Sequence, residues 1–265
     1  MINIATLNIN SVNARLNNLC RWLSAEQPDV LLLQEIKTEF NNFPFFDLQM
    51  AGYEAKILGQ KSYNGVAILS RHPLNTKNEN IPNFHDDNAR YLECEIKIKD
   101  KTYTVASLYL PNGNPPASAP NDTQKFEYKL QWMDALTAHA ENLLQQNKNV
   151  ILGGDFNVIM TPRDVYNPDL FKGDALYRPE VQKRLRYLSR TGFCDTYRAL
   201  CPDQTGYTFW DYNAGSFQND LGLRIDYIFS SPSLTDKLVS CRIDRDFRSW
   251  EKSSDHTVFS VQFEE

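Results

Sequence analysis

The sequence is poor in cysteine. Its few cysteines are widely spaced, and no two of them form a Cys-x-x-Cys pair: Cys20, Cys94, Cys194, Cys201 and Cys241. An odd number at irregular spacing excludes both a disulfide framework and a zinc site of the common paired type. We therefore expect reduced thiols that are mostly buried.

Long apolar runs are also missing. Residues 30–33 form one of the longest, whereas a helix that spans a membrane needs about 20 apolar residues. The first residues show no basic stretch followed by an apolar one, so we expect no signal peptide. The sequence predicts a cytoplasmic protein without a membrane partner.

Basic residues are not in excess, since 28 Lys and Arg face 33 Asp and Glu, for a net charge of −5. The net charge says little about local fields, and a metal site made of carboxylates itself lowers the total. Residues 178–198 contain six basic side chains against two acidic ones. That stretch is either a solvated helix face or a surface for nucleic acid, and the charge balance permits both.

What the chain does contain is an interleaved series of strand and helix patterns. Its 265 residues are near the upper limit for one hydrophobic core, and no linker or repeat appears, so we expect a single domain over residues 1–265. A helix capped by Ser11, a long helix over residues 126–144 and a third from Pro179 to Gly192 are predicted. Strand patterns cover residues 2–9, 29–35, 65–70, 91–98, 102–110, 149–154, 224–230 and 257–263.

These patterns predict a mixed α/β fold with helices packed on sheet. Residues 111–122 contain four prolines and are expected to be irregular.

Carboxylate and amide side chains recur where the predicted strands begin or end. They are Asn8, Glu35, Asp155, Asn157 and Asp255, and the imidazole of His256 stands beside Asp255. Strand ends in layered sheets meet at one rim, where sites are commonly built. Taken singly, a Glu that follows a strand, such as Glu35, is usually a surface residue. The segment 153–157 is equally well read as a turn with an Asx hydrogen bond.

Asp226 lies within the apolar stretch 223–229, where a carboxylate is costly unless it is paired. Among the histidines, His256 is the best partner because Ser254 and Asp255 beside it already resemble a site. The other histidines are expected to be structural: His72, His85 and His139. No Gly-x-Ser-x-Gly elbow occurs, so water is the expected nucleophile of this Asp–His pair.

Hard oxygen donors without a Cys or His cluster suit Mg²⁺, with Mn²⁺ as a substitute, rather than zinc. Such an ion binds one or two carboxylates and completes its coordination with water and phosphate oxygens. This chemistry indicates a phosphoester substrate.

Seven segments resemble, in order and along almost the whole chain, exodeoxyribonuclease III and its relatives, the apurinic/apyrimidinic endonucleases. They are Leu7-Asn-Ile-Asn-Ser, Leu33-Gln-Glu-Ile-Lys, Tyr63-Asn-Gly-Val-Ala, Leu108-Tyr-Leu-Pro-Asn-Gly, Gly154-Asp-Phe-Asn, Leu223-Arg-Ile-Asp and Ser254-Asp-His.

The resemblance implies a four-layered α/β sandwich, in which two packed sheets are covered by helices. It also implies Mg²⁺-dependent hydrolysis of double-stranded DNA, either 5′ to abasic sites or at 3′ ends, where nucleotides and blocking groups are removed. A monomeric, nucleoid-associated protein of bacterial type is the corresponding expectation.

The resemblance also assigns roles at the site. Glu35 matches a metal ligand, with Asn8 beside it and Asp255 as a second ligand near the metal. Asp155 matches the group that activates or positions the attacking water.

Further roles concern the phosphate. Asn157 and Tyr109 match phosphate contacts. Asp226 matches the residue that orients the imidazole of His256, and a neighbouring carboxylate favours the imidazolium, which can donate to a phosphate oxygen.

DNA-binding residues are expected at less specific positions. Backbone phosphates are assigned to Arg90, Asn112, Lys125 and Arg178, which position DNA without reading bases. Phe209 and Trp210 stand where many relatives have consecutive tryptophans, so they are either pocket walls or core. Asn213 replaces an arginine that close bacterial relatives often carry.

Two alternatives remain open. One is a phosphatase of the same fold acting on another phosphoester, like the inositol-polyphosphate phosphatases. The other is a catalytically silent nucleic-acid-binding relative, which would be expected to lack some of the site residues. Here the full set is present.

Overall fold

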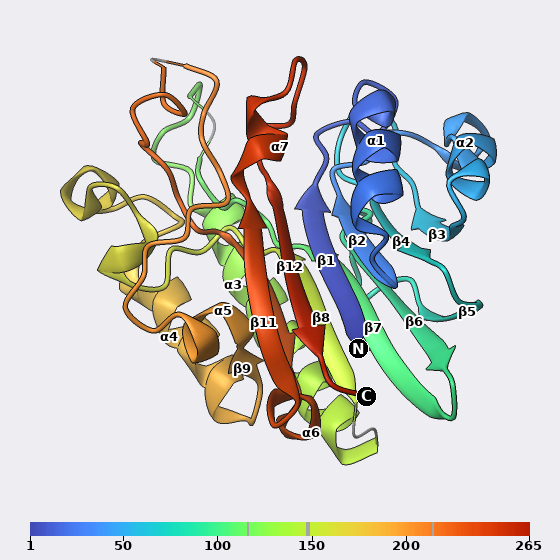
Figure 1. The fold of residues 1–265 in the computed structure, drawn as a ribbon. Coiled ribbons are helices and arrows are strands. Elements are labelled where there is room, and N and C mark those ends of the chain that lie inside the picture. Colours follow the sequence, from blue (N-terminus) through green and yellow to red (C-terminus); the bar gives the residue numbers. More distant parts are fainter. Residues whose placement is uncertain (116, 147–148, 214) are drawn as a thin grey trace.

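The computed structural model describes residues 1–115, 117–146, 149–213 and 215–265. Two six-stranded mixed sheets pack face to face (Figure 1). The first sheet has the order β11 (Leu238–Asp244), β12 (Val258–Phe263), β1 (Ile2–Asn8), β2 (Val30–Gln34), β4 (Val66–Ser70) and β3 (Glu54–Leu58). The second has the order β5 (Leu74–Asn78), β6 (Tyr91–Ile98), β7 (Lys101–Tyr109), β8 (Val150–Asp155), β10 (Asp226–Ser230) and β9 (Cys194–Asp195).

The helices are α1 (Leu16–Glu26), α2 (Phe45–Met50), α3 (Gln124–Gln146), α4 (Pro179–Arg190), α5 (Thr196–Leu200), α6 (Pro232–Thr235) and α7 (Arg245–Ser249). None of those in the described ranges is long and apolar enough to cross a membrane.

Buried side chains divide the molecule into layers. One cluster, which includes Leu32 and Val105, lies between the two sheets. A second cluster joins the outer face of the first sheet to α1 and α2. A third joins the outer face of the second sheet to α3 and α4. The predicted four-layered α/β sandwich is confirmed.

Strand β2 shows why these strands look apolar throughout. Val30 and Leu32 face the second sheet, whereas Leu31 and Leu33 pack against the helix layer. Because both faces are covered, the strand has no polar alternation.

Strand direction brings the polar strand ends to one rim. β1 runs parallel to β2, and β7 runs parallel to β8, so Asn8 lies beside Gln34 and Tyr109 beside Asp155. β10 runs antiparallel to β8, so its first residue, Asp226, also lies beside Asp155. Asp226 therefore begins its strand rather than lying in the middle of it, as the apolar stretch around it had suggested.

Two glycines allow β8 to reach this position. A Cβ on Gly153 would lie 2.5 Å from Cδ1 of Leu32 in the facing sheet. A Cβ on Gly154 would lie 1.9 Å from the backbone oxygen of Leu108 in β7. The strand that delivers Asp155 thus packs closely against a neighbouring strand and the facing sheet.

The prediction that Ser11 caps a helix is wrong, because α1 begins at Leu16. Asn10 and Ser11 have φ values of 48° and 84°, and the Ser11 amide donates to the backbone oxygen of Glu35 at 2.7 Å. Pairing with the loop after β2 keeps this segment out of the helix.

The structure also contains strands that the sequence did not indicate: β3, β5, β9 and β11. They are the edge strands of the two sheets and are partly exposed, so they lack a clear apolar pattern. The expectation of mostly buried cysteines is wrong as well, since only Cys94 is buried and the other thiols are partly exposed.

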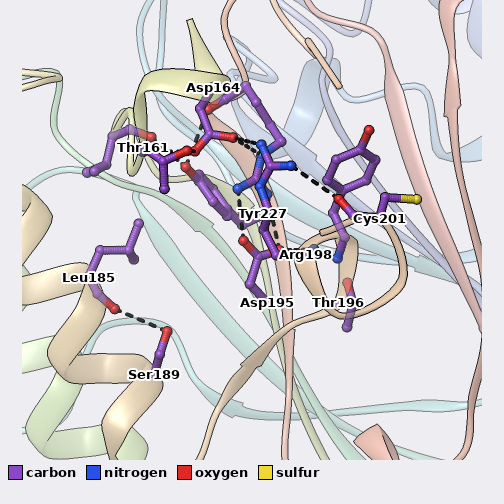
Figure 2. A network of polar contacts seen from close by, with 12 residues as sticks. Thr161, Asp164, Leu185, Ser189, Asp195, Thr196, Arg198, Cys201 and Tyr227 are labelled. Carbon is purple, nitrogen blue, oxygen red and sulfur yellow. Dashed lines mark hydrogen bonds and ion pairs between the residues drawn. The ribbon is translucent and has the colours of Figure 1, made fainter. Parts of the chain in front are cut away.

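A buried arginine fixes the segment that leads into β10. Arg224 Nε donates to Asp164 at 2.6 Å, and its two terminal nitrogens donate to Asp195 at 3.1 and 2.9 Å. Figure 2 shows these two carboxylates together with Arg198, which also donates to Asp164. Burial would raise the pKa of Asp164, but the charge and hydrogen bond of Arg224 outweigh it and lower that pKa. The network holds the chain two residues before Asp226.

We predict that Arg224→Met lowers the free energy of unfolding by about 3–5 kcal/mol at neutral pH, because buried Asp195 loses its guanidinium partner and Asp164 keeps only that of Arg198. The pKa of Asp164 is lowered in the folded protein. Its stabilising contribution is therefore complete above the unfolded value of about 3.9 and is lost as the pH falls through the lower folded value. The difference in the free energy of unfolding between wild type and variant should become smaller below about pH 4. Urea titrations at several pH values measure this difference.

Lys172→Met is the matched control, because the Lys172–Asp169 pair is exposed. It should leave the free energy of unfolding nearly unchanged. An Arg224→Met protein as stable as wild type would contradict the role assigned to Arg224.

Candidate active site

Three buried side chains from both sheets meet at the rim. His256 Nδ1 lies 2.8 Å from Asp226 Oδ2, and His256 Nε2 lies 3.7 Å from Asp155 Oδ2. Their exposed fractions are 4%, 0% and 1% for His256, Asp226 and Asp155. Within the part of the chain that the structure describes, Asp226 Oδ1 has no hydrogen-bond partner.

Electrostatics set the protonation of this group. Burial disfavours the imidazolium, but the carboxylates of Asp226 and Asp155 outweigh it and raise the pKa of His256 to about 10. Burial raises the pKa of Asp155 to about 7, although the charge of His256 opposes this. At neutral pH, His256 is a cation beside a carboxyl group that can exchange a proton.

Asn8 connects this group to Glu35. Its fully buried Nδ2 donates to Glu35 Oε1 at 2.8 Å and to Asp155 Oδ2 at 3.0 Å. Its Oδ1 accepts from the Asn10 amide at 3.2 Å. One side chain at the end of β1 therefore joins a carboxylate of the first sheet to one of the second.

Glu35 lies in a left-handed conformation with φ 50°, immediately after β2. Lys37 Nζ lies 2.7 Å from its Oε2. Burial would raise the pKa of Glu35, but the hydrogen bonds from Asn8 and Lys37 lower it. Glu35 is thus a stable carboxylate. The sequence had given no role to Lys37, although it stands two positions after Glu35.

Asp255 lies at the same rim and is partly exposed. Its Oδ1 accepts from Asn10 Nδ2 at 3.0 Å, and Asn10 Oδ1 in turn accepts from Lys37 at 2.6 Å. Asn10 therefore links the surroundings of Glu35 to Asp255. Sequence reasoning missed Asn10, and its position within the segment 7–11 was the one signal for it.

Asn157 and Tyr109 flank Asp155. The Asn157 amide donates to Asp155 Oδ1 at 2.9 Å, and Asn157 adopts φ 47°. Asn112 Nδ2 lies 3.5 Å from Asn157 Oδ1. Burial and the charges of Glu35 and Asp155 hold the pKa of Tyr109 well above its usual value. Its phenol therefore stays protonated and can donate a hydrogen bond.

A cavity of about 430 Å³ adjoins these groups. Phe209 forms one wall, and its ring centroid lies 4.9 Å from that of His256 in an edge-on arrangement. Tyr166, Phe171 and Asn213 also line the cavity. The Phe209 wall therefore lies directly beside the Asp–His pair.

The remaining predicted DNA-binding residues are more dispersed. Arg90 donates to the Tyr109 backbone oxygen at 3.2 Å and lies over the Tyr109 ring. Lys125 is exposed in the first turn of α3. Arg178 stacks on Phe126 of the same turn and pairs with Glu180.

Trp210 points away from this surface. It is only 1% exposed, and its Nε1 donates to Asp220 at 3.1 Å. It lines a different pocket from Phe209. Because its ring is buried, it offers no face for stacking on DNA.

The donor chemistry of the rim suits a hard divalent cation. Glu35 Oε1 accepts from Asn8 and Oε2 pairs with Lys37, and carboxylate oxygens have further lone pairs; Asp226 Oδ1 has no partner among the described residues. Asp155 and Asp226 also offer carboxylate oxygens within 4.8 Å of each other, whereas His256 as an imidazolium has no lone pair to offer. Oxygen donors predominate, as Mg²⁺ and Mn²⁺ prefer.

Comparison with known proteins gives a consistent result. Exodeoxyribonuclease III of Haemophilus influenzae is 29% identical over 266 residues, which cover 97% of this chain and 98% of that protein. An AP endonuclease from Archaeoglobus fulgidus superposes with a TM-score of 0.92 at 31% identity, covering 100% of both chains. The 3′ phosphatase NExo from Neisseria, bound to a product DNA hairpin, superposes with a TM-score of 0.91 at 32% identity, also over 100% of both chains.

The family model that matches this chain extends over residues 5–256 and therefore includes every polar group described at the rim. The chain belongs to the Endonuclease/Exonuclease/phosphatase family.

Proposed function

We propose that this protein is a DNA-repair phosphodiesterase that hydrolyses DNA 5′ to abasic sites or removes nucleotides and blocking groups from 3′ ends. The observation that carries the proposal is the buried imidazole of His256, which Asp226 holds 3.7 Å from Asp155 at the rim that also carries Glu35. Support comes from relatives that are named exodeoxyribonuclease III, AP endonuclease and 3′ phosphatase.

Glu35 would hold a Mg²⁺ or Mn²⁺ ion, with Asp255 as a second carboxylate. Asn8 keeps Glu35 in place, because its Nδ2 fixes one of the carboxylate oxygens. A bound divalent ion supplies charge neutralisation at the phosphate and makes a coordinated water more acidic.

Asp155 receives the proton of the attacking water, whose oxygen bonds to phosphorus while the bond from phosphorus to the leaving oxygen breaks. The leaving oxygen takes a proton from solvent. The raised pKa of Asp155, about 7, matches the role of proton acceptor near neutral pH. The Asn157 amide and Asn8 Nδ2 each donate to this carboxyl group, and they orient it toward the space beside His256.

The imidazolium of His256 donates to a phosphate oxygen as negative charge develops in the transition state. Such preorganised donors act most strongly where water is excluded, as at this buried site. Asn157 and the protonated phenol of Tyr109 are further donors to the same phosphate group.

DNA approaches across the residues around the rim. Backbone phosphates contact Arg90, Asn112, Lys125 and Arg178, and Phe209 forms the wall that receives the abasic sugar or the 3′-terminal residue. Trp210 is not part of this surface, because it is buried.

We also propose that residues 1–265 act as one domain and as a monomer in the cytoplasm, in association with the nucleoid. A catalytically silent binding protein is disfavoured, because every proposed catalytic group is present and suitably placed.

The proposal is tested on three duplexes with Mg²⁺. One contains a single tetrahydrofuran abasic analogue, one has a recessed 3′ end, and one carries a 3′ phosphate. Asp155→Ala and a chelator are the controls. No reaction on any duplex would contradict the proposal, and reaction at 3′ ends alone would restrict it to the exonuclease and 3′-phosphatase activities.

We predict that a chelator abolishes cleavage and that added Mg²⁺ or Mn²⁺ restores it. Glu35→Gln keeps the shape of the side chain but removes its charge, so the ion concentration for half-maximal rate should rise at least about tenfold, as expected when a metal-binding group is altered. Metal titrations of the initial rate measure this change. An unchanged titration curve would remove Glu35 from the metal site.

We predict that Asp226→Asn lowers kcat/KM by about 10²–10³ at pH 8, as expected when one transition-state donor is lost. Asp226 and Asp155 raise the pKa of His256 to about 10 in the folded protein. Without the Asp226 carboxylate, burial should return this pKa toward or below the ordinary value of about 6.5. The alkaline limb of the pH–rate profile should therefore move toward neutrality.

His256→Asn is the matched control. It should lower the rate and remove the alkaline limb that His256 produces, and adding Asp226→Asn to it should have little further effect, because the pair acts as a unit. Independent, multiplicative losses would contradict the pairing.

A further inference from the structure

A lysine occupies a core position of α3. Lys129 is 0% exposed and lies on the inward face with Phe126, Met133 and Leu136. A long charged side chain is almost never fully buried unless it is paired. Apolar packing does not explain the burial of Lys129, so its ammonium group must have polar partners.

The ammonium group donates to three backbone carbonyls. Lys129 Nζ lies 2.9 Å from the oxygen of Asn112, 2.6 Å from that of Asn157 and 3.1 Å from that of Ala175. Three acceptors match the three hydrogens of an ammonium group. Burial lowers the pKa of Lys129 to about 7, against the opposing charges of Asp155 and Asp174.

These carbonyls belong to three separate segments: the loop after β7, the loop after β8 and the segment before α4. The segments also contact one another directly, since Asn114 bonds to the side chain of Asp174 and to the amide of Ala175. Gly113 lies against the lysine, and a Cβ there would be 2.6 Å from Lys129 Cδ.

Two of the three residues are proposed phosphate contacts. Asn157 is left-handed and donates its backbone amide to Asp155. Asn112 is exposed at the cavity, and its amide lies 3.5 Å from that of Asn157. Moving either carbonyl away from Lys129 would move the backbone that carries the amide side chain of the same residue, although the Asn157 side-chain amide also donates to the Leu110 backbone oxygen at 2.9 Å.

We propose that Lys129 is a positioning residue for catalysis, whose ammonium group sets the places of the Asn112 and Asn157 amides relative to Asp155. This inference rests on the proposed function, since it concerns the same phosphate site. Lys129 itself does not touch the substrate. It acts through the two backbone carbonyls, from beneath the loops.

A double-mutant cycle tests the proposal on the duplex that wild type cleaves best. Lys129→Met should lower kcat/KM at least tenfold, mainly through kcat. In an Asn112→Ala/Asn157→Ala background, the same change should cost less than threefold, because the side chains that it positions are already absent. Equal losses in both backgrounds would overturn the proposal.

Leu136→Ala is the matched control, since Leu136 is buried on the same face of α3 and is 2% exposed. It should lower the urea midpoint but leave kcat/KM within about threefold of wild type, as expected for a destabilised but folded protein. Gly113→Ala perturbs the same contact from the loop side and serves as a second variant if Lys129→Met folds poorly. It should show the activity loss expected of Lys129→Met.

Amide hydrogen exchange provides a readout that does not depend on activity. Exchange within residues 112–115, 156–158 and 174–176 should accelerate in Lys129→Met or Gly113→Ala but not in Leu136→Ala. Unchanged exchange would overturn the inference even if the enzyme is active. If exchange accelerates in these variants but the wild-type protein has no nuclease activity, the loop contact is supported and the proposed function is rejected.

Discussion

The structure depends on how three buried or half-buried acids, Glu35, Asp155 and Asp226, are held at the seam between two sheets. Asn8 donates to Glu35 and Asp155 together and separates their charges. Lys37 pairs with Glu35, and His256 lies between Asp226 and Asp155. Like charges at such distances are unfavourable unless cations or donors offset them. A divalent ion bound at the rim would offset the negative charge that these cations and donors leave.

The sandwich makes this arrangement possible. Two parallel strand pairs deliver their carboxyl ends to one rim, and the antiparallel β10 places Asp226 beside Asp155. Gly153 and Gly154 bring β8 close to its neighbours, and Arg224 anchors the entry to β10. The proposed catalytic groups therefore stand on strand ends or within two residues of them, whereas the cavity beside them is built from loops. Chemistry and substrate preference thus belong to different parts of the fold.

Much of the fold and most of the rim were predictable from the sequence. Strands buried on both faces, such as β2, give continuous apolar runs, and polar residues at their ends are conspicuous. Asp226 stood out because an isolated carboxylate in an apolar stretch requires a partner. Lys129 was detectable in principle, since it interrupts the apolar face of a helix, but its acceptors are backbone carbonyls in three distant segments and leave no side-chain pattern.

The sequence by itself determined the α/β layering, the family resemblance and the identity of the polar groups that meet at the rim, because burial and strand ends leave local patterns. Only the tertiary structure decided that Ser11 pairs with the loop after β2 instead of capping α1. It likewise decided that Trp210 is core while Phe209 lines the cavity. These outcomes depend on contacts between residues far apart in the chain, and neighbouring residues do not encode them.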